Sequence, residues 1–167
     1  MTVYNNKDKI SGIEDIKDGD IIAIPSDLTN GGRALKLLEK AGIIECDPEK
    51  GFVPTKADIT KYNVQIEILE AESATLANLL PDCAAAIING GNAFTAGLNP
   101  STDAIFTEDV NPDTNEAVPE LINVIAARTA DKDNEVYKKI VEAYQSDETA
   151  KTIEEAYQGA FICSWKA

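Results

Sequence analysis

The sequence predicts an α/β fold in which helices flank a mostly parallel sheet. Short apolar runs alternate along the chain with amphipathic segments of helical periodicity, and one run, residues 83–88, is apolar throughout. Alternating strands and helices are typical of α/β layers, and an uninterrupted apolar strand is typical of a parallel sheet covered on both faces. Ligands of such sheets bind beyond the carboxyl ends of the strands, so the residues that follow each strand are the first candidates for a site.

The composition argues against several classes of partner. The chain has 167 residues, enough for one domain or for one lobe with an attached segment. Its formal net charge of −14 argues against nucleic acid and anionic membrane surfaces, because both attract basic patches. No apolar run approaches the roughly 20 residues of a transmembrane helix. No signal peptide is visible, so we expect either a cytosolic protein or one whose natural N-terminus has been removed.

We expect no cofactor, no metal and no catalysis. The sequence lacks histidine, the commonest general base and metal ligand. Cys46, Cys83 and Cys163 form no CxxC pair and so predict neither a zinc site nor a disulfide framework. The glycine-rich stretches lack the spacing of phosphate-binding and dinucleotide-binding loops. Ser26 and Thr29 have no histidine to activate them, although an enzyme that uses a pair of carboxylates remains an alternative.

Residues 21–41 combine a buried strand, a tight glycine turn and an amphipathic helix. The strand is the apolar run 21–24, and Gly31 and Gly32 allow the backbone to come close to whatever lies above it. The apolar face of the helix consists of Ala34, Leu35, Leu37, Leu38 and Ala41. Arg33 falls in the first helical turn, where free N–H groups and the helix dipole already favour an anion. This turn therefore predicts half of a site for a small anionic or zwitterionic ligand.

A second glycine turn, Asn89-Gly90-Gly91-Asn92, follows the strand over 83–88. Both turns fall at the carboxyl ends of expected strands, which is the strongest argument within the sequence for a binding site. Asparagine side chains both donate and accept hydrogen bonds and suit the ammonium and carboxylate groups of an amino acid, and Arg33 suits the carboxylate.

Each candidate residue also has a structural alternative. Arg33 could be a surface charge paired with a nearby acid, and Asn89 could be a turn residue. Asn123, within an apolar run, could lie on the exposed face of a sheet. Thr29 and Asn30 could simply cap the helix.

The remaining elements follow from periodicity and from cap and turn residues. In chain order they are a short helix capped by Ser11 and Glu14, a short helix over 56–62, a strand over 64–69, a helix over 73–80, a short helix reaching Gly97, a strand over 104–107, a polar loop over 108–120, a strand over 121–127, and helices over 133–145 and 147–157.

Four segments resemble the NlpA/MetQ lipoprotein family, the methionine-binding receptors of ABC importers. They are AIPSDLTNGGRALKLLEKAGII, AAIINGGNAFTAGLNPSTDAIFTED, INVIAAR and VEAYQSDETAKTIEEAYQGAFICSW. They occur in the family's order and extend over essentially all of the chain. The resemblance implies a lobe of the periplasmic-binding-protein-like (type II) fold, with the amino acid, most plausibly L-methionine, held in a cleft between two lobes.

The resemblance also implies the role of individual residues. Arg33 matches the arginine that holds the ligand carboxylate, and Asn89 and Asn123 match asparagines that hydrogen-bond the amino-acid backbone of the ligand. Thr29 and Asn30 belong to the same loop as Arg33 and are weaker candidates. The implied partners are the membrane subunits of the importer, and the implied location is the cell envelope.

The resemblance begins about a hundred residues into the family pattern, after most of the first lobe. It implies three parts: a crossover segment over 1–19, the second α/β lobe over 20–120, and a return strand with C-terminal helices over 121–167 that normally complete the first lobe. The apolar faces of those helices must then find another surface, either on the second lobe or by element exchange in a homodimer. A third functional alternative is a non-transporting remnant or interaction module.

Overall fold

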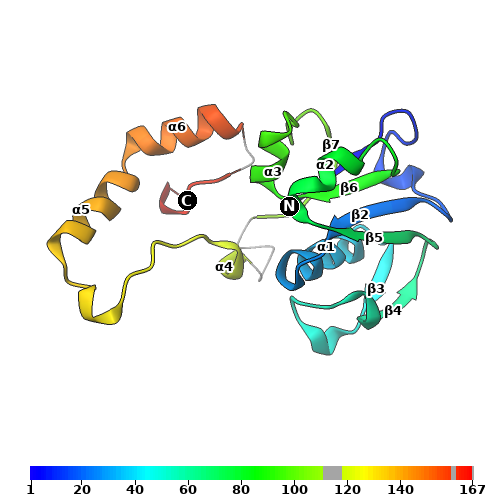
Figure 1. Ribbon diagram of the computed structural model, residues 1–167, viewed down its shortest axis with the longest axis horizontal. Coiled ribbons are helices and arrows are strands. Elements are labelled where there is room, and N and C mark those ends of the chain that lie inside the picture. The colour runs from blue at the N-terminus through cyan, green and yellow to red at the C-terminus, as the bar shows by residue number, and fades with distance from the viewer. Residues whose placement is uncertain (111–117, 159–160, 167) are drawn as a thin grey trace. The chain divides into compact units, whose positions relative to one another are not determined.

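The computed structural model describes residues 1–110, 118–158 and 161–166 (Figure 1). The chain divides into two compact units, Met1–Glu108 and Asp109–Ala167. The first unit contains a five-stranded sheet with helices, which confirms the expected α/β class. The expected division into 1–19, 20–120 and 121–167 stays a prediction about how the chain relates to a two-lobed protein.

The sheet of the first unit is mixed. Its strands are β1 (Thr2–Asn5), β2 (Ile21–Pro25), β5 (Glu67–Ala71), β6 (Ala85–Ile88) and β7 (Ala104–Thr107), in the spatial order β5-β2-β6-β1-β7. β2 pairs in parallel with β5 and β6, whereas β1 pairs antiparallel with β6 and β7. β5, β2, β6 and β7 therefore share one direction, β1 opposes them, and the carboxyl ends of the four meet at one edge.

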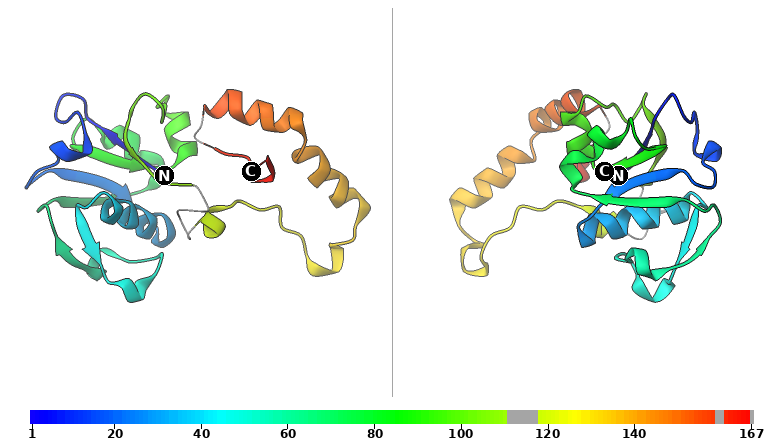
Figure 2. Two further views of the ribbon diagram at one scale, coloured as in Figure 1. Left: turned by 180° about the vertical axis from the view of Figure 1, so that it is seen from behind. Right: turned by 45° about the vertical axis from the view of Figure 1, so that its right-hand side comes forward.

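Helices cover both faces of this sheet (Figure 1, Figure 2). They are α1 (Leu28–Lys40) on one face and α2 (Leu76–Leu79) and α3 (Gly90–Thr95) on the other. Ile22 of β2 packs in the same apolar cluster as Leu35 and Leu38 of α1. Ala23, the next residue, points to the opposite face and packs in the cluster that contains Leu76 of α2. This alternation makes β2 a central strand that is buried on both sides.

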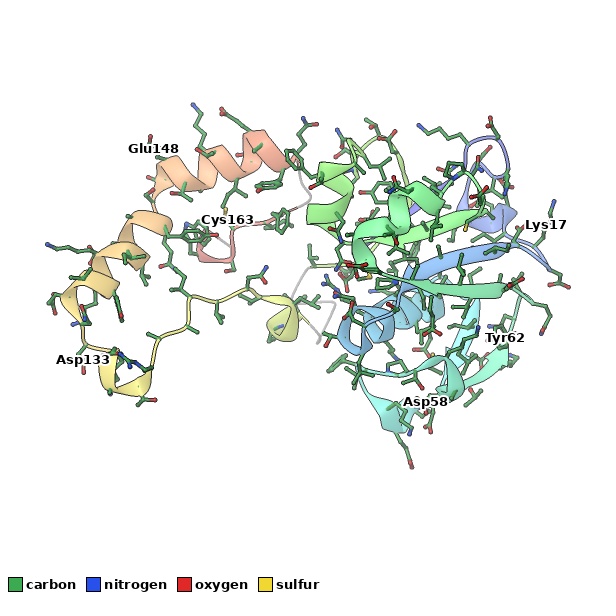
Figure 3. All side chains as sticks on the ribbon, in the orientation of Figure 1. Lys17, Asp58, Tyr62, Asp133, Glu148 and Cys163 are labelled. Atoms are coloured by element: carbon green, nitrogen blue, oxygen red, sulfur yellow. The ribbon has the colours of Figure 1, made fainter. Side chains whose placement is uncertain are left out.

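A small second sheet replaces the helix that residues 56–62 predict. Its strands are β3 (Ile44–Cys46) and β4 (Ile59–Tyr62), which pair antiparallel. Only one 3-10 turn precedes β4, because Asp58 accepts hydrogen bonds from the backbone N–H and the hydroxyl of Thr55, at 2.8 and 2.6 Å, and closes the turn. Figure 3 labels Asp58, directly before β4, and Tyr62, the last residue of β4. Pairing with β3 then determines the strand conformation that the local pattern did not reveal.

Other elements of the first unit agree with the sequence apart from their ends. The strands expected over 21–24, 83–88 and 104–107 are confirmed as β2, β6 and β7, and the strand expected over 64–69 begins later, as β5. The short helix expected after Ser11 is a single 3-10 turn, and Asp15, rather than Ser11 with Glu14, closes it by accepting from the Ser11 and Gly12 N–H groups.

The second unit consists of short helices. They are α4 (Val118–Leu121), α5 (Glu135–Tyr144) and α6 (Asp147–Tyr157), with 3-10 turns at Thr129–Asp131 and Ser164–Lys166. The helices expected over 133–145 and 147–157 are thereby confirmed. Ring contacts connect their ends to the C-terminal segment: the centroids of Tyr144 and Trp165 lie 5.7 Å apart. None of the side chains described in this unit is buried.

The prediction of a return strand over 121–127 is wrong. Leu121 is the last residue of α4, and the residues that follow form no regular structure. The apolar run predicts a strand only if a neighbour supplies the hydrogen-bonding ladder, and no described strand of the second unit does so. Val124, in the middle of the run, is 79% exposed. Residues 118–121 of the expected polar loop are helical, whereas 111–117 lie outside the described residues.

Candidate functional site

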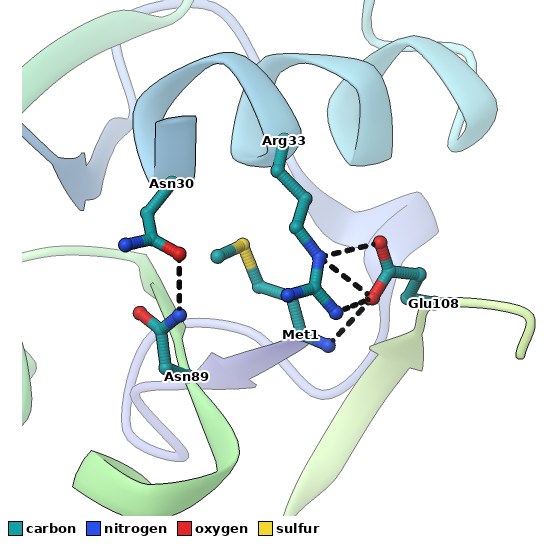
Figure 4. Close-up of polar contacts among 5 residues, drawn as sticks. All are labelled: Met1, Asn30, Arg33, Asn89 and Glu108. Atoms are coloured by element: carbon teal, nitrogen blue, oxygen red, sulfur yellow. Dashed lines mark hydrogen bonds and ion pairs between the residues drawn. The ribbon is translucent and has the colours of Figure 1, made fainter. Parts of the chain in front are cut away.

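The two glycine turns meet, as the sequence predicts. β2 and β6 are neighbouring parallel strands, so the turns that follow them lie at the same edge of the sheet. Asn30, in the first turn of α1, and Asn89, immediately before α3, are in direct contact. The Asn89 Nδ2 group donates a hydrogen bond to Asn30 Oδ1 at 2.8 Å (Figure 4).

Asp27 determines how the Asn30 amide is turned. Its carboxylate caps α1 by accepting from the Asn30 N–H at 2.9 Å, and its two oxygens also accept from Asn30 Nδ2 at 3.0 and 3.1 Å. The Ser73 hydroxyl donates to Asp27 Oδ2 at 3.1 Å. The backbone hydrogen bond from Asn30 is the main reason that the pKa of Asp27 is lowered, and the Asn30 and Ser73 side chains add to it. A carboxylate that only accepts thus orients the amide nitrogen of Asn30 toward itself.

This orientation continues to Asn89 and leaves one atom without a partner. Asn30 turns its side-chain oxygen toward Asn89. Asn89 must therefore donate from its amide nitrogen, and its own Oδ1 points away from Asn30. Asn89 Oδ1 is buried and has no hydrogen-bond partner among the described residues. An unsatisfied buried acceptor costs about 1–3 kcal/mol. The site therefore favours a small molecule or a water that brings a donor to this oxygen.

The two glycines of the first turn serve packing against the chain itself. A Cβ atom on Gly31 would lie 2.7 Å from the carbonyl oxygen of Pro25, and one on Gly32 would lie 2.7 Å from the Cα atom of Val53. The expected close approach of the backbone is present, but the neighbours of these glycines are the end of β2 and the loop before β4. Because Gly31 and Gly32 have no side chains, α1 can begin close to the end of β2.

Arg33 points to a carboxylate of the same unit. Its Nε atom donates to Glu108 Oε1 at 2.8 Å and to Oε2 at 3.0 Å, and its Nη2 atom donates to Oε2 (Figure 4). The amino group of Met1 donates to the same oxygen at 2.8 Å. Burial alone would raise the pKa of Glu108, but the hydrogen bond from Arg33 and the positive charges outweigh it and lower the pKa. Arg33 Nη1 has no partner among the described residues.

Glu108 is the site residue that the sequence reasoning missed. Its side chain is 11% exposed and that of Arg33 is 26% exposed, so the pair is largely shielded from water. The signal was available: Glu108 directly follows β7, whose carboxyl end lies at the same edge as those of β2 and β6. Assigning 108–120 to a polar loop concealed it.

The other two predicted residues, Thr29 and Asn123, make no contact with these side chains that the structure describes. Thr29 is exposed on α1, and its hydroxyl makes no hydrogen bond within the described part of the chain. Asn123 belongs to the second unit and is exposed in the irregular segment after α4. The ligand-binding roles of Arg33, Asn89, Asn123, Thr29 and Asn30 all stay predictions.

Two further properties bear on the kind of site. Across residues 1–110, 118–158 and 161–166, no group of three or more cysteine, aspartate or glutamate side chains is placed to hold a metal ion. In the same residues, no helix is both long and apolar enough to cross a membrane.

Comparison with known proteins shows the same family from several directions. The family described as NlpA lipoprotein matches residues 1–165. The chain is 37% identical over 159 residues to the D-methionine-binding lipoprotein MetQ of Salmonella typhimurium. This alignment covers 94% of this chain and 56% of that protein. It is 37% identical, with the same coverage, to Lipoprotein 28 of Escherichia coli. The chain thus spans little more than half the length of these relatives.

Solved structures agree in fold. The chain matches the methionine binding protein MetQ with a TM-score of 0.84 at 35% identity, over 98% of this chain and 64% of that one. It matches a nutrient binding protein from Burkholderia cenocepacia bound to methionine with a TM-score of 0.83 at 33% identity, over 98% and 65% of the two chains. These proteins confirm the substrate-binding-protein architecture that the motifs imply. The chain belongs to the NlpA lipoprotein family.

Proposed function

We propose that this chain forms the ligand-binding edge of a substrate-binding protein that serves an ABC importer and that its ligand is an amino acid, most plausibly L-methionine. The observation that carries the proposal is a pair of unused polar atoms at one edge of the sheet. Arg33 Nη1 is a cationic donor, and Asn89 Oδ1 is a buried acceptor. A zwitterionic amino acid offers a carboxylate to the first and an ammonium group to the second.

The relatives support methionine over other amino acids. One is named as a D-methionine-binding lipoprotein and one solved neighbour is bound to methionine. We propose that the ligand is the L-enantiomer. We also propose that Asn123, Thr29 and Asn30 contribute to its binding. A binding protein of this kind releases its ligand unchanged, so we propose that the chain performs no catalysis.

The partners and the location follow from the same relationship. We propose that the ligand is delivered to the membrane subunits of an importer and that the protein acts at the cell envelope. Relatives are named lipoproteins, and one is named Outer membrane lipoprotein 3, from Mannheimia haemolytica. The exposed apolar side chains of α5 additionally favour a homodimer by exchange of elements.

Ligand analogues that each lack one charge test the zwitterion model. L-methionine and D-methionine should raise the unfolding temperature, by roughly 5 °C or more for a ligand present at about 100 times its Kd. L-methioninamide, which lacks the carboxylate, and N-acetyl-L-methionine, which lacks the ammonium group, should have little effect. Equal shifts from methionine and from either analogue would contradict recognition of that charge.

Arg33→Ala tests the residue that carries the proposal. The variant should lose most of the shift that L-methionine causes, because a ligand carboxylate without its cation loses an interaction of about 1.5–3 kcal/mol. Lys61→Ala is the matched control, since it removes the same charge from an exposed pair with Glu45 in the small second sheet. Loss of the shift in both variants would point to net charge, and retention in Arg33→Ala would contradict the site.

A further inference from the structure

Glu108 holds Arg33 by one particular edge of the guanidinium. The carboxylate contacts Nε and Nη2, the side-on arrangement, and makes no contact with Nη1. A guanidinium has five N–H groups in one plane. The side-on pair occupies the Nε–H and one N–H of Nη2, so both N–H groups of Nη1 and the second of Nη2 remain. The remaining N–H of Nη2 and one N–H of Nη1 form the end-on edge, which can donate to another carboxylate in bidentate fashion.

The Nη1 atom lies on the side of the guanidinium away from Glu108. In Figure 4, Glu108 lies on one side of Arg33 and the Asn30–Asn89 pair lies on the other, and the side chain of Met1 is drawn between Arg33 and that pair. Arg33 and Asn30 are three residues apart on α1 and thus on one face of the helix. Arg33 and Asn89, which carries the unpaired Oδ1, thus both belong to the turns at this edge of the sheet.

We propose that Glu108 is a positioning residue, which fixes the Arg33 guanidinium so that its end-on edge receives the carboxylate of the ligand. This inference rests on the proposed function, because it concerns how the same site recognises an amino acid. It assigns to Glu108 a contact with Arg33 and none with the ligand.

The opposite role, a carboxylate that competes with the ligand for Arg33, is weaker on two grounds. An arginine side chain has many rotamers, and Glu108 removes this conformational freedom before the ligand arrives, so the free energy of binding no longer includes its loss. The negative charge of Glu108 also pairs with Arg33 itself on the side-on edge. Its repulsion of a ligand carboxylate on the end-on edge of the guanidinium is correspondingly reduced.

Calorimetric titration of the full chain with L-methionine tests this role in three variants. Glu108→Gln keeps the size and one acceptor but loses the charge, and Glu108→Asp keeps the charge on a shorter side chain. Glu45→Gln is the control, because it removes the same charge from an exposed pair. We expect Glu108→Gln to weaken binding by roughly tenfold, Glu108→Asp to weaken it less, and Glu45→Gln to leave it unchanged.

A second readout follows Arg33 itself. NMR of the arginine side chains should show the Arg33 Nε–H signal shifted and slow to exchange in the free chain, unchanged on addition of L-methionine, and fast to exchange in Glu108→Gln. Loss of that signal on addition of methionine would show that the ligand displaces Glu108 and would overturn the inference.

The outcomes distinguish the two levels of the account. If the wild-type chain gives no heat with L-methionine, the proposed function fails and the positioning role fails with it. If the wild-type chain binds and Glu108→Gln binds equally well or more tightly, with an unchanged unfolding temperature, the positioning role alone is contradicted.

Discussion

The orientation of a single amide shows how a short series of hydrogen bonds sets the chemistry of this site. The Asp27 carboxylate can only accept hydrogen bonds, so the amide nitrogen of Asn30 points toward it. The amide nitrogen of Asn89 then donates to the oxygen of Asn30, and the buried oxygen of Asn89 is left unpaired. The sequence indicated that both asparagines matter, because each is in a turn that ends a strand. It did not indicate that Asp27 orients them, because an aspartate at that position is also an ordinary helix cap.

Asp27→Ala should act on stability and on binding together. We expect the free energy of unfolding, measured in urea at neutral pH, to fall by about 1 kcal/mol, the usual contribution of an N-cap side chain. We also expect methionine to bind more weakly, because the Asn30 amide is no longer held in place. The lowered pKa of Asp27 sets the pH range of the stability effect. The native carboxylate stabilises the fold above its ordinary pKa of 3.8 and loses this effect as the pH falls through its lower native value.

The difference in stability between Asp27→Ala and the wild-type chain should therefore be largest at neutral pH and shrink below pH 3.8. Thr29→Ala is the control for stability alone, since Thr29 is exposed two residues further along the same helix start and its hydroxyl makes no hydrogen bond in the described part of the chain. A difference that persists unchanged at pH 2 would contradict the capping role.

The elements show which features local patterns can predict. Strands β2 and β6 and helix α1 follow from the sequence because burial on both faces or on one helical face leaves a periodic pattern. The helix expected over 56–62 became a turn and β4, and the strand expected over 121–127 is irregular. In both places the conformation depends on whether a neighbouring strand supplies hydrogen bonds, a condition that a local pattern does not contain. Glu108 was missed for a related reason, since its partner Arg33 is 75 residues away.

The junction of β2 with α1 makes a prediction about Gly32. A Cβ atom there would lie 2.7 Å from the Cα atom and 3.0 Å from the carbonyl carbon of Val53, both backbone atoms. Gly32→Ala must therefore displace the loop before β4 and should lower the free energy of unfolding by about 1–3 kcal/mol, despite the better helix propensity of alanine.

Gly12→Ala is the matched control for Gly32→Ala, because the atoms nearest its Cβ belong to the exposed side chain of Glu14, which can move away. Urea unfolding measures both. A Gly32→Ala chain that is as stable as the control would contradict the tight packing of α1 on the loop.

At the scale of the whole molecule, the two units differ in how they bury apolar side chains. The first has two clusters of buried residues on the faces of its sheet, whereas no described side chain of the second is buried. Val136 and Ile140 of α5 are 62% and 52% exposed. Apolar side chains on one helical face favour association with another surface.

We expect sedimentation of the wild-type chain to show a dimer at micromolar concentration, as the proposed exchange of elements requires. A Val136→Glu/Ile140→Glu double variant should sediment as a monomer, because two charges on the apolar face oppose its burial. Lys138→Glu, on the opposite side of the same helix, should leave the dimer intact. A wild-type chain that is monomeric at all concentrations would contradict the homodimer.

We propose that Arg33 and Asn89 recognise the zwitterionic part of an amino acid. The first measurement to make is calorimetric titration of the wild-type chain with L-methionine. The account predicts saturable binding at one site for each chain, with a Kd in the micromolar range or tighter, which corresponds to about 8 kcal/mol. A titration that shows no saturable heat with L-methionine, D-methionine or other amino acids would contradict it.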